Sequence, residues 1–126
     1  MNVIDSSLWM EYFLGNDIDF SIRSAIVNID SLIVPTICVY EVYRKMLTEK
    51  DSSVAYVLAG IMRKGKIVDI TCDIALLAAG LSKQHGLPMA DSIIYATAKI
   101  NNAILWTQDQ HFRHLDAVNY FPKFSI

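Results

Sequence analysis

Short, fully apolar runs alternate along the chain with longer stretches in which apolar residues recur at helical spacing. The short runs predict buried strands at 2–5, 32–34, 66–70 and 103–106. The longer stretches predict helices at about 6–14, 18–27, 36–48, 52–63, 73–85 and 89–100. Residues 117–121 form either a fifth strand or a packed tail. Apolar strands that alternate with helices indicate one three-layer α/β domain over 1–126, with a mainly parallel central sheet and helices on both faces.

Residues near the expected helix ends agree with these boundaries. Ser6 or Ser7 can cap the first helix, and Thr36 can cap the third. Gly86 can end the fifth helix, and Pro88 stands where the sixth begins.

Composition limits the class of protein. The chain of 126 residues is 53% hydrophobic, which is ample for one packed core and excludes a disordered protein. Its longest apolar run, 74–81, is far shorter than the roughly 18 residues of a membrane span. No basic residue precedes Arg23, unlike in a secretory signal. We therefore expect a cytoplasmic protein without a membrane segment, in which Cys38 and Cys72 are buried free thiols and not a disulfide.

Charge is unevenly distributed, although the formal net charge is only −2. Residues 1–43 carry a net charge of −5, residues 44–66 carry +4, and the remainder carries −1. An acidic segment beside a basic one suits an enzyme that binds cations and acts on a phosphate backbone. Two solvated helices with ordinary surface lysines give the same pattern, so charge alone favours neither interpretation.

Three acids lie at places where a parallel sheet binds ligands or a helix begins. Asp5 ends the first predicted strand, and Asp109 follows the fourth. If these strands are neighbours, both carboxylates enter one crevice beyond the carboxyl ends of the strands. Each also has a structural interpretation, since Asp5 can cap a helix and Asp109 can stabilise a turn. Asp91 lies in the first turn of a predicted helix, where the helix dipole alone favours an acid.

Glu41 lies away from the apolar stripe of its predicted helix. That stripe consists of Val39, Val42, Tyr43 and Met46, and Glu41 points nearly the opposite way. The same face also carries Ile37 and Tyr40, which allows packing against another element. Periodicity therefore favours a solvent-exposed glutamate, as is usual for this residue type, over a metal ligand.

Other kinds of active site lack the residues that they need. The serines and histidines show no nucleophile elbow, and the five glycines form no phosphate-binding loop. No group of histidines and cysteines has the spacing of zinc ligands. What remains is an excess of carboxylates at the functional edge of the sheet, and carboxylate oxygens are the ligands that Mg²⁺ and Mn²⁺ prefer.

Four blocks spread over nearly the whole chain form a recognisable pattern. They are VIDSS at 3–7, PT at 35–36 followed by YEV at 40–42, GLPMADSIIYATA at 86–98, and LWTQDQHF at 105–112. In this order and at these separations the blocks resemble the PIN-domain ribonucleases, above all the VapC-type toxins of toxin–antitoxin systems. The last two blocks are the most specific, since an acid after a strand is common by itself.

This resemblance implies a particular site. Four acids should meet in one pocket as catalytic residues and as ligands of Mg²⁺, which Mn²⁺ can replace: Asp5, Glu41, Asp91 and Asp109. Supporting hydroxyls are implied at Thr107 and Ser6. One departure is His111, which stands where some relatives have a further acid. The resemblance therefore implies a primary metal site but not a second one.

The resemblance also implies an activity and partners. It implies a Mg²⁺-dependent endoribonuclease in which water is the nucleophile, so that the products carry 5′-phosphate and 3′-hydroxyl ends. A cognate antitoxin protein and a homodimer are implied as well. With RNA as the substrate, we expect the basic segment to contact its backbone through five residues: Arg44, Lys45, Arg63, Lys64 and Lys66.

Two alternatives share some of these features. A receiver-like signalling module has a similar length, a parallel sheet and an acidic Mg²⁺ pocket. It requires paired acids after the first strand and a late lysine, whereas two serines follow Asp5 and residues 107–109 read Thr-Gln-Asp. The second alternative is an inactive PIN-like scaffold that binds RNA or protein. The complete set of acids argues against it, since a scaffold gains nothing from their mutual repulsion.

Overall fold

In the computed structural model, which describes residues 1–123, five strands form one sheet in the order β3-β2-β1-β4-β5. Every pairing between them is parallel. The strands are β1 (Asn2–Ile4), β2 (Leu32–Pro35), β3 (Lys66–Val68), β4 (Ile104–Thr107) and β5 (Val118–Tyr120). The predicted parallel sheet is confirmed, and the stretch at 117–121 contributes a fifth strand and not a packed tail.

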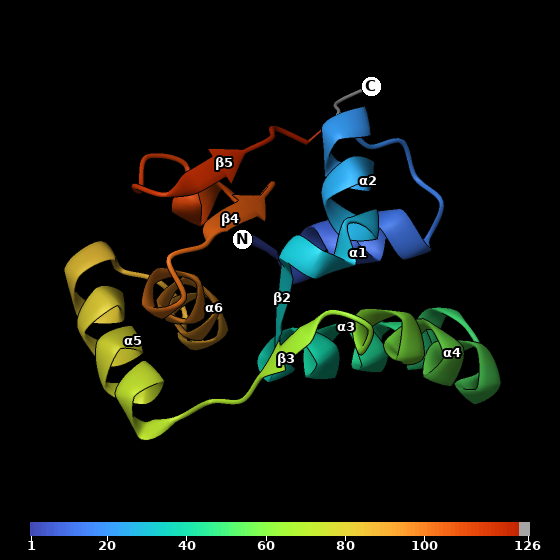
Figure 1. The fold of residues 1–126 in the computed structure, drawn as a ribbon, viewed down its shortest axis with the longest axis horizontal. Helices are drawn as coiled ribbons and strands as arrows, with labels where there is room; N and C mark the ends of the chain where they lie inside the picture. The colour runs from blue at the N-terminus through green and yellow to red at the C-terminus, as the bar shows by residue number, and fades with distance from the viewer. Residues whose placement is uncertain (124–126) are drawn as a thin grey trace.

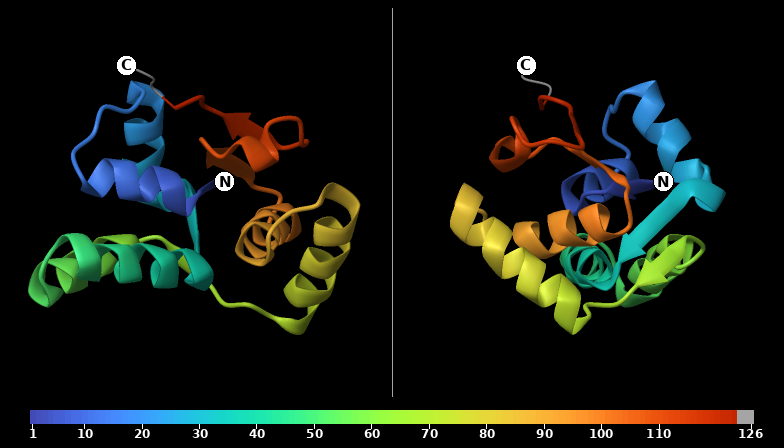
Figure 2. Two further views of the ribbon diagram at one scale, coloured as in Figure 1. Left: turned by 180° about the vertical axis from the view of Figure 1, so that it is seen from behind. Right: turned by 60° about the vertical axis from the view of Figure 1, so that its left-hand side comes forward.

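Helices cover both faces of this sheet, as predicted. Within 1–123 they are α1 (Ser6–Phe13), α2 (Phe20–Val27), α3 (Thr36–Glu49), α4 (Ser52–Met62), α5 (Cys72–His85) and α6 (Met89–Ile100), with short 3₁₀ helices η1 (Ile29–Ser31) and η2 (Gln110–Phe112). In Figure 1, α1 and α2 lie on one side of the sheet, while α6, with α5 outside it, lies on the other. The view from behind in Figure 2 shows the same separation. Helix α3 packs against both α1 and α4.

The central strands are buried on both faces. Val3, Ile4, Ile33, Val34 and Leu105 are each at most 2% exposed. Because successive residues of a strand point to opposite faces, neighbours such as Val3 and Ile4 are both buried only when both faces are covered. This explains why these strands appear in the sequence as continuous apolar runs and not as alternating patterns.

Two helices begin differently from the prediction. Asp5, and neither Ser6 nor Ser7, caps α1, and the backbone N–H of Ser6 donates to Asp5 Oδ1 at 2.9 Å. Helix α3 begins directly after Pro35 without a side-chain cap, because Thr36 is already its first helical residue. In α1 the single residue between strand and helix is the cap, as the structural interpretation of Asp5 expects, whereas α3 follows Pro35 of β2 directly and has no residue left for a side-chain cap.

Both cysteines are free thiols, as predicted, but only one is buried. Cys38 on α3 is buried, whereas Cys72 at the start of α5 is exposed, so the prediction of burial is wrong for Cys72. Helix α5 directs Ile74, Ala78 and Leu81 into the core. Cys72 precedes Ile74 by two positions, which places it about 200° around the helix and on the solvent side.

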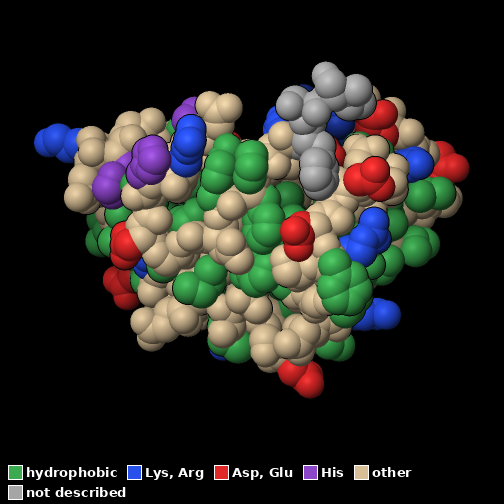
Figure 3. All heavy atoms as spheres, turned by 90° about the horizontal axis from the view of Figure 1, so that it is seen from above, with side chains coloured by type: hydrophobic (Ala, Val, Ile, Leu, Met, Phe, Trp, Pro, Cys, Tyr) green, Lys and Arg blue, Asp and Glu red, His purple; other side chains and the backbone are tan. Residues whose placement is uncertain are grey.

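The surface on the side of β5 and α2 mixes apolar and charged side chains. Figure 3 shows apolar side chains in the middle of this face, with acidic and basic ones scattered around them. Exposed apolar side chains include Phe20 of α2, which is 81% exposed. Within the part of the chain that the structure describes, no helix is both long and apolar enough to cross a membrane.

Gly65 allows the chain to pass close to β2 as it enters β3. A Cβ at this position would lie 2.9 Å from Val34 Cγ2 and 3.1 Å from the backbone oxygen of Leu32. Both neighbours are buried, and a close-packed core gives little room to move. Strand β3 then ends at Val68, two residues before the predicted end, because Val68 pairs with Pro35, the last residue of β2.

Gly65→Ala should destabilise the protein by about 1–3 kcal/mol, because the added methyl group overlaps Val34. Gly60→Ala is the matched control, since it adds the same group inside α4, where nothing lies within 4 Å. That change should stabilise the protein by roughly 0.5–1 kcal/mol. Chemical denaturation of both variants measures the two free energies of unfolding, and similar values for both would contradict the packing role of Gly65.

Candidate functional site

The carboxyl edge of the sheet brings two acids together. Strand β1 lies between β2 and β4 and pairs with both. Asp5 directly follows β1, and Asp109 comes two residues after β4. The strand order reverses between β1 and β4, and such a switch point is where open α/β sheets bind ligands. The condition for a shared crevice, that the two strands be neighbours, is confirmed.

Asp5 is buried at the base of this crevice, with only 3% of its surface exposed. Besides capping α1 through Oδ1, it accepts hydrogen bonds at Oδ2 from Ser7 Oγ at 2.9 Å and Thr107 Oγ1 at 2.8 Å. Burial raises the pKa of Asp5 above its usual value, these two hydroxyls lower it, and the charges of neighbouring acids raise it. The contact with Ser7 was not predicted, because Ser7 had only the role of an alternative cap.

Thr107 connects the two acids of the central strands. Its fully buried hydroxyl donates to Asp5 Oδ2 and accepts a hydrogen bond from the backbone N–H of Asp109 at 2.9 Å. One side chain of β4 therefore holds the carboxylate that follows β1 and the backbone of the acid that follows β4. The position of Thr107 fits the supporting hydroxyl that the resemblance implies.

Glu41 lies beside the start of α1 and is only partly exposed. Ser6 Oγ donates to Glu41 Oε1 at 2.7 Å. The exposed glutamate predicted from periodicity is therefore wrong. Helix α3 buries Cys38, Val42 and Met46, yet it also packs against α1, so it has two covered sides and not one.

The turn between α5 and α6 directs Asp91 toward the crevice. Gly86 ends α5 with a φ of 68°, in the left-handed region that favours glycine. Ser82 Oγ donates to the backbone oxygen of Leu87 at 2.7 Å and ties this turn to α5. Asp91 then lies in the first turn of α6, as predicted. Burial, together with the charges of two neighbouring acids, raises the pKa of Asp91 to about 6.

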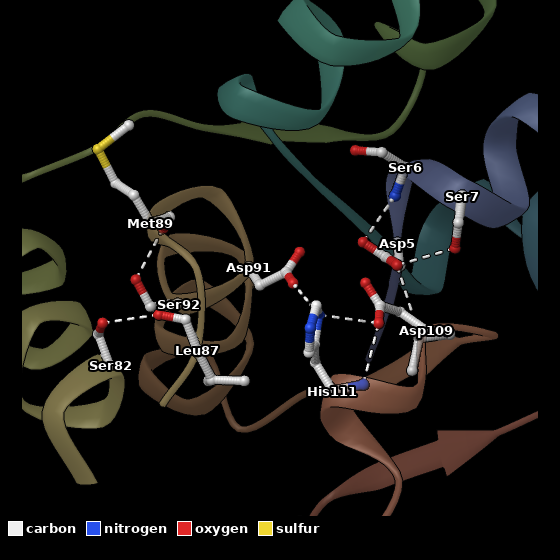
Figure 4. A network of polar contacts seen from close by, with 11 residues as sticks. Asp5, Ser6, Ser7, Ser82, Leu87, Met89, Asp91, Ser92, Asp109 and His111 are labelled. Carbon is white, nitrogen blue, oxygen red and sulfur yellow. Dashed lines mark hydrogen bonds and ion pairs between the residues drawn. The ribbon is translucent and has the colours of Figure 1, made fainter. Parts of the chain in front are cut away.

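His111 lies between Asp91 and Asp109 (Figure 4). Its Nδ1 is 3.1 Å from Asp91 Oδ2 and 3.0 Å from Asp109 Oδ1. Asp109 also caps η2, because its Oδ1 accepts a hydrogen bond from the backbone N–H of His111 at 2.9 Å. The charge of Asp109 raises the pKa of His111 above its usual value. In the sequence, His111 stood out only as a departure from the family pattern, and its contact with α6 had no local signal.

The four acids lie around the crevice without a lysine or arginine partner. Within 1–123, no lysine or arginine forms an ion pair with any of them: Asp5, Glu41, Asp91 and Asp109. Such a cluster is unfavourable unless a cation or protons neutralise it. Asp91, Asp109 and His111 offer three donor atoms that lie within 4.8 Å of one another. The structure thus brings two of the implied acids, Asp91 and Asp109, together with a histidine, while Asp5 and Glu41 lie near enough for their charges to interact with this group or with each other.

A pocket of about 620 Å³ opens beside Asp109 and His111. Its wall is formed by Ser7, Gln108, Asp109, Gln110, His111, Tyr120, Pro122 and Lys123. Lys123 brings a positive charge to this wall, which suits an anionic ligand. No sequence pattern pointed to Tyr120 or Lys123, because they come from the last strand and the segment after it.

The five basic residues predicted to contact RNA lie in two separate places. Two of them, Arg44 and Lys45, line a groove of about 360 Å³ that also contains Glu41. The other three precede or begin β3, at the amino edge of the sheet, which is opposite to the acids: Arg63, Lys64 and Lys66. The structure therefore places only part of the basic segment beside the crevice.

Known proteins share this sequence pattern and this fold. The PIN domain family model matches residues 3–118, while no curated protein matches the sequence. A solved toxin–antitoxin complex from Klebsiella pneumoniae is 19% identical with a TM-score of 0.83, covering 98% of this chain and 100% of that chain. VapBC2 from Rickettsia felis, bound to a DNA fragment from its promoter, is 15% identical with a TM-score of 0.74, covering 96% and 97%. VapC20 from Mycobacterium tuberculosis, a sarcin-ricin loop cleaving toxin, is 15% identical with a TM-score of 0.64, covering 82% and 85%.

Asp91→Asn should raise the melting temperature at pH 8 in excess EDTA, because one repelling charge is removed while the side-chain shape is kept. The sign follows from the pKa, which is about 6 in the folded protein against an ordinary value of 3.8. The folded state holds this proton more tightly, so the carboxyl lowers stability as pH rises from about 4 to 6. Above that window the whole loss is present, and the substitution should have its full effect.

Asp73→Asn is the matched control for this measurement. Asp73 also lies in the first turn of a helix, but it is exposed at the end of α5 opposite to the turn that leads to Asp91. Losing its favourable contact with the helix dipole should lower the melting temperature, at a cost of up to about 1 kcal/mol. If both variants melt at lower temperature, Asp91 is an ordinary helix-start acid.

Proposed function

Because the chain belongs to the PIN domain family, we propose that it is a metal-dependent endoribonuclease that hydrolyses RNA phosphodiester bonds and acts as the toxin of a toxin–antitoxin pair. The observation that carries this proposal is the crevice of four acids, none of which pairs with a lysine or arginine in the described part of the chain. Keeping such a cluster costs folding free energy, and binding of a divalent cation to the folded state offsets that cost.

The chemistry of the donor set fits a divalent cation. Asp5 is buried, yet its carboxylate meets only hydroxyl and N–H donors and no counter-charge. Carboxylate oxygens are the donors that Mg²⁺ and Mn²⁺ prefer. The residues that would hold the cation are Asp5, Glu41, Asp91 and Asp109. When bound, the cation would supply stabilisation of negative charge on the scissile phosphate and activation of water for attack.

The accessible acids are the ones that reach the substrate. The side chains of Asp91 and Asp109 are 16% and 31% exposed, whereas Asp5 is buried. Asp91 or Asp109 therefore orients the attacking water, and Asp5 would hold the cation from the buried side of the crevice. The water oxygen bonds to phosphorus and gives up a proton, the bond between phosphorus and O3′ breaks, and O3′ takes up a proton from the solvent. Because water is the nucleophile, the RNA 2′-hydroxyl takes no part, and the products carry 5′-phosphate and 3′-hydroxyl ends.

The toxin assignment is supported by the solved relatives. One is a toxin–antitoxin complex, and another is a sarcin-ricin loop cleaving toxin. By analogy, this chain is a VapC-type toxin that binds a cognate antitoxin protein, forms a homodimer and cleaves RNA in the cytoplasm. The receiver-like alternative loses its support, since the PIN domain model spans residues 3–118. An inactive PIN-like scaffold would belong to the same family, and the cleavage assay described next distinguishes it from an active enzyme.

Asp5→Asn, Asp91→Asn and Asp109→Asn should each reduce RNA cleavage by more than about 100-fold, because even contacts that only support metal ligands are worth roughly 10–100-fold. Asparagine keeps the shape of each side chain and, at position 5, the ability to cap α1. Cleavage of end-labelled RNA with Mg²⁺ or Mn²⁺, and with excess EDTA, measures the effect. Growth arrest on expression should disappear in the same variants.

The control for this assay is Asp73→Asn, an exposed acid of α5 that should leave cleavage unchanged. Full activity in excess EDTA, or in any one of the three crevice variants, would refute the proposed chemistry. RNA binding by the unaltered chain without any cleavage would assign it to the inactive scaffolds.

Arg44 and Lys45, beside Glu41, should contribute more to RNA binding than the basic residues at the amino edge. Arg44→Gln with Lys45→Gln should weaken binding to unrelated RNAs and flatten its dependence on log salt by about 0.7 per lost phosphate contact with a single strand. Binding is measured in an Asp109→Asn background, so that the RNA stays intact.

The matched control neutralises the three residues at the opposite edge of the sheet: Arg63, Lys64 and Lys66. It removes one more positive charge than the double variant, yet it should change the salt dependence less. A larger change of the salt dependence in the triple variant would show that RNA binds at the amino edge of the sheet.

A further inference from the structure

The imidazole of His111 occupies the space between two carboxylates of the crevice. Nδ1 lies 3.1 Å from Asp91 Oδ2 and 3.0 Å from Asp109 Oδ1, and Figure 4 shows the ring pointing into the gap between them. Neighbouring donors around a six-coordinate cation with bonds of roughly 2.1 Å lie about 3 Å apart. The separations from the ring nitrogen to the two oxygens therefore suit three ligands of one ion.

The backbone holds this ring in position. The backbone N–H of Asp109 donates to Thr107 Oγ1, and the backbone N–H of His111 donates to Asp109 Oδ1. These two hydrogen bonds fix the backbone at Asp109 and at His111 in the turn from β4 into η2. The histidine side chain is nevertheless 54% exposed. The ring therefore lies at the solvent side of the crevice and not in the core.

We propose that His111 is a ligand of the cation at this site, together with Asp91 and Asp109, and that its nitrogen gives the site a preference for Mn²⁺ over Mg²⁺. The inference rests on the proposed metal-dependent function. Mg²⁺ strongly prefers oxygen donors, whereas imidazole suits transition ions. Replacing one carboxylate or water oxygen by imidazole nitrogen shifts the relative affinity toward Mn²⁺ and the later first-row ions, in line with the general order of affinities.

Pulsed electron paramagnetic resonance of the full chain with bound Mn²⁺ tests this directly, because a coordinated imidazole modulates the electron spin echo at ¹⁴N frequencies. The unaltered chain should show this modulation, and His111→Gln should lose it. His114→Gln is the matched control, since His114 is an exposed histidine three residues further along. The modulation should persist in that variant.

Relative affinity gives a second measurement. Titration calorimetry with Mn²⁺ and with Mg²⁺ yields the ratio of the two dissociation constants. In His111→Asp, which replaces nitrogen by oxygen, the preference for Mn²⁺ over Mg²⁺ should be reduced or lost. His114→Gln should keep the preference of the unaltered chain.

The outcomes separate this inference from the proposed function. Bound Mn²⁺ without ¹⁴N modulation in the unaltered chain, or modulation that persists in His111→Gln, would overturn the role of His111 and leave the metal site standing. An unchanged ratio of affinities in His111→Asp would overturn the preference. Failure of the unaltered chain to bind either ion would overturn the proposed function as well.

Discussion

Mutual repulsion among the acids of the crevice is the constraint on which the arrangement of its neighbours depends. A parallel sheet places the ends of β1 and β4 side by side, so the acids that follow them are forced close together. Hydroxyl groups hold two of these acids, Ser6 on Glu41 and both Ser7 and Thr107 on Asp5, while the imidazole of His111 lies between the other two, Asp91 and Asp109. A hydroxyl satisfies an oxygen atom without cancelling its charge. The crevice therefore keeps its negative potential while its side chains stay ordered.

The structural interpretations of Asp5 and Asp109 as helix caps are confirmed, and these contacts are compatible with the proposed role of both acids as metal ligands. Asp5 caps α1 with Oδ1 and presents Oδ2 to Thr107. Asp109 caps η2 and also faces His111. Asp91 lies where the dipole of α6 favours an acid, yet burial and charge raise its pKa to about 6. A helix start beside a strand end is thus a ready place to hold a carboxylate in a fixed orientation.

The local sequence pattern predicted correctly those features that a single strand or helix determines. It failed for side chains whose surroundings depend on how two elements pack. The ends of β1 and β4 marked Asp5 and Asp109, because apolar runs that stop at an acid are visible along the chain. Periodicity placed Glu41 in solvent because its side of α3 shows no continuous apolar stripe. That side is nevertheless covered by α1, whose Ser6 donates a hydrogen bond to Glu41. The contact of His111 with Asp91 requires α6 to lie beside η2, a relation between residues 20 positions apart. The resemblance to PIN-domain ribonucleases carried information about Glu41 that periodicity lacked.

The hydrogen bonds of Thr107 give the crevice a direction. A hydroxyl has one proton, and Thr107 gives it to Asp5, so toward Asp109 it can act only as an acceptor. The chain of contacts therefore runs one way, from the backbone of the accessible acid through the threonine to the buried acid. The hydrogen bond to the Asp5 carboxylate fixes the rotation of the Thr107 hydroxyl. The same oxygen then accepts the backbone N–H of Asp109 and so holds the loop that carries this acid. The buried charge of Asp5 is thus connected, through a single hydroxyl, to the backbone that positions the more accessible carboxylate of Asp109.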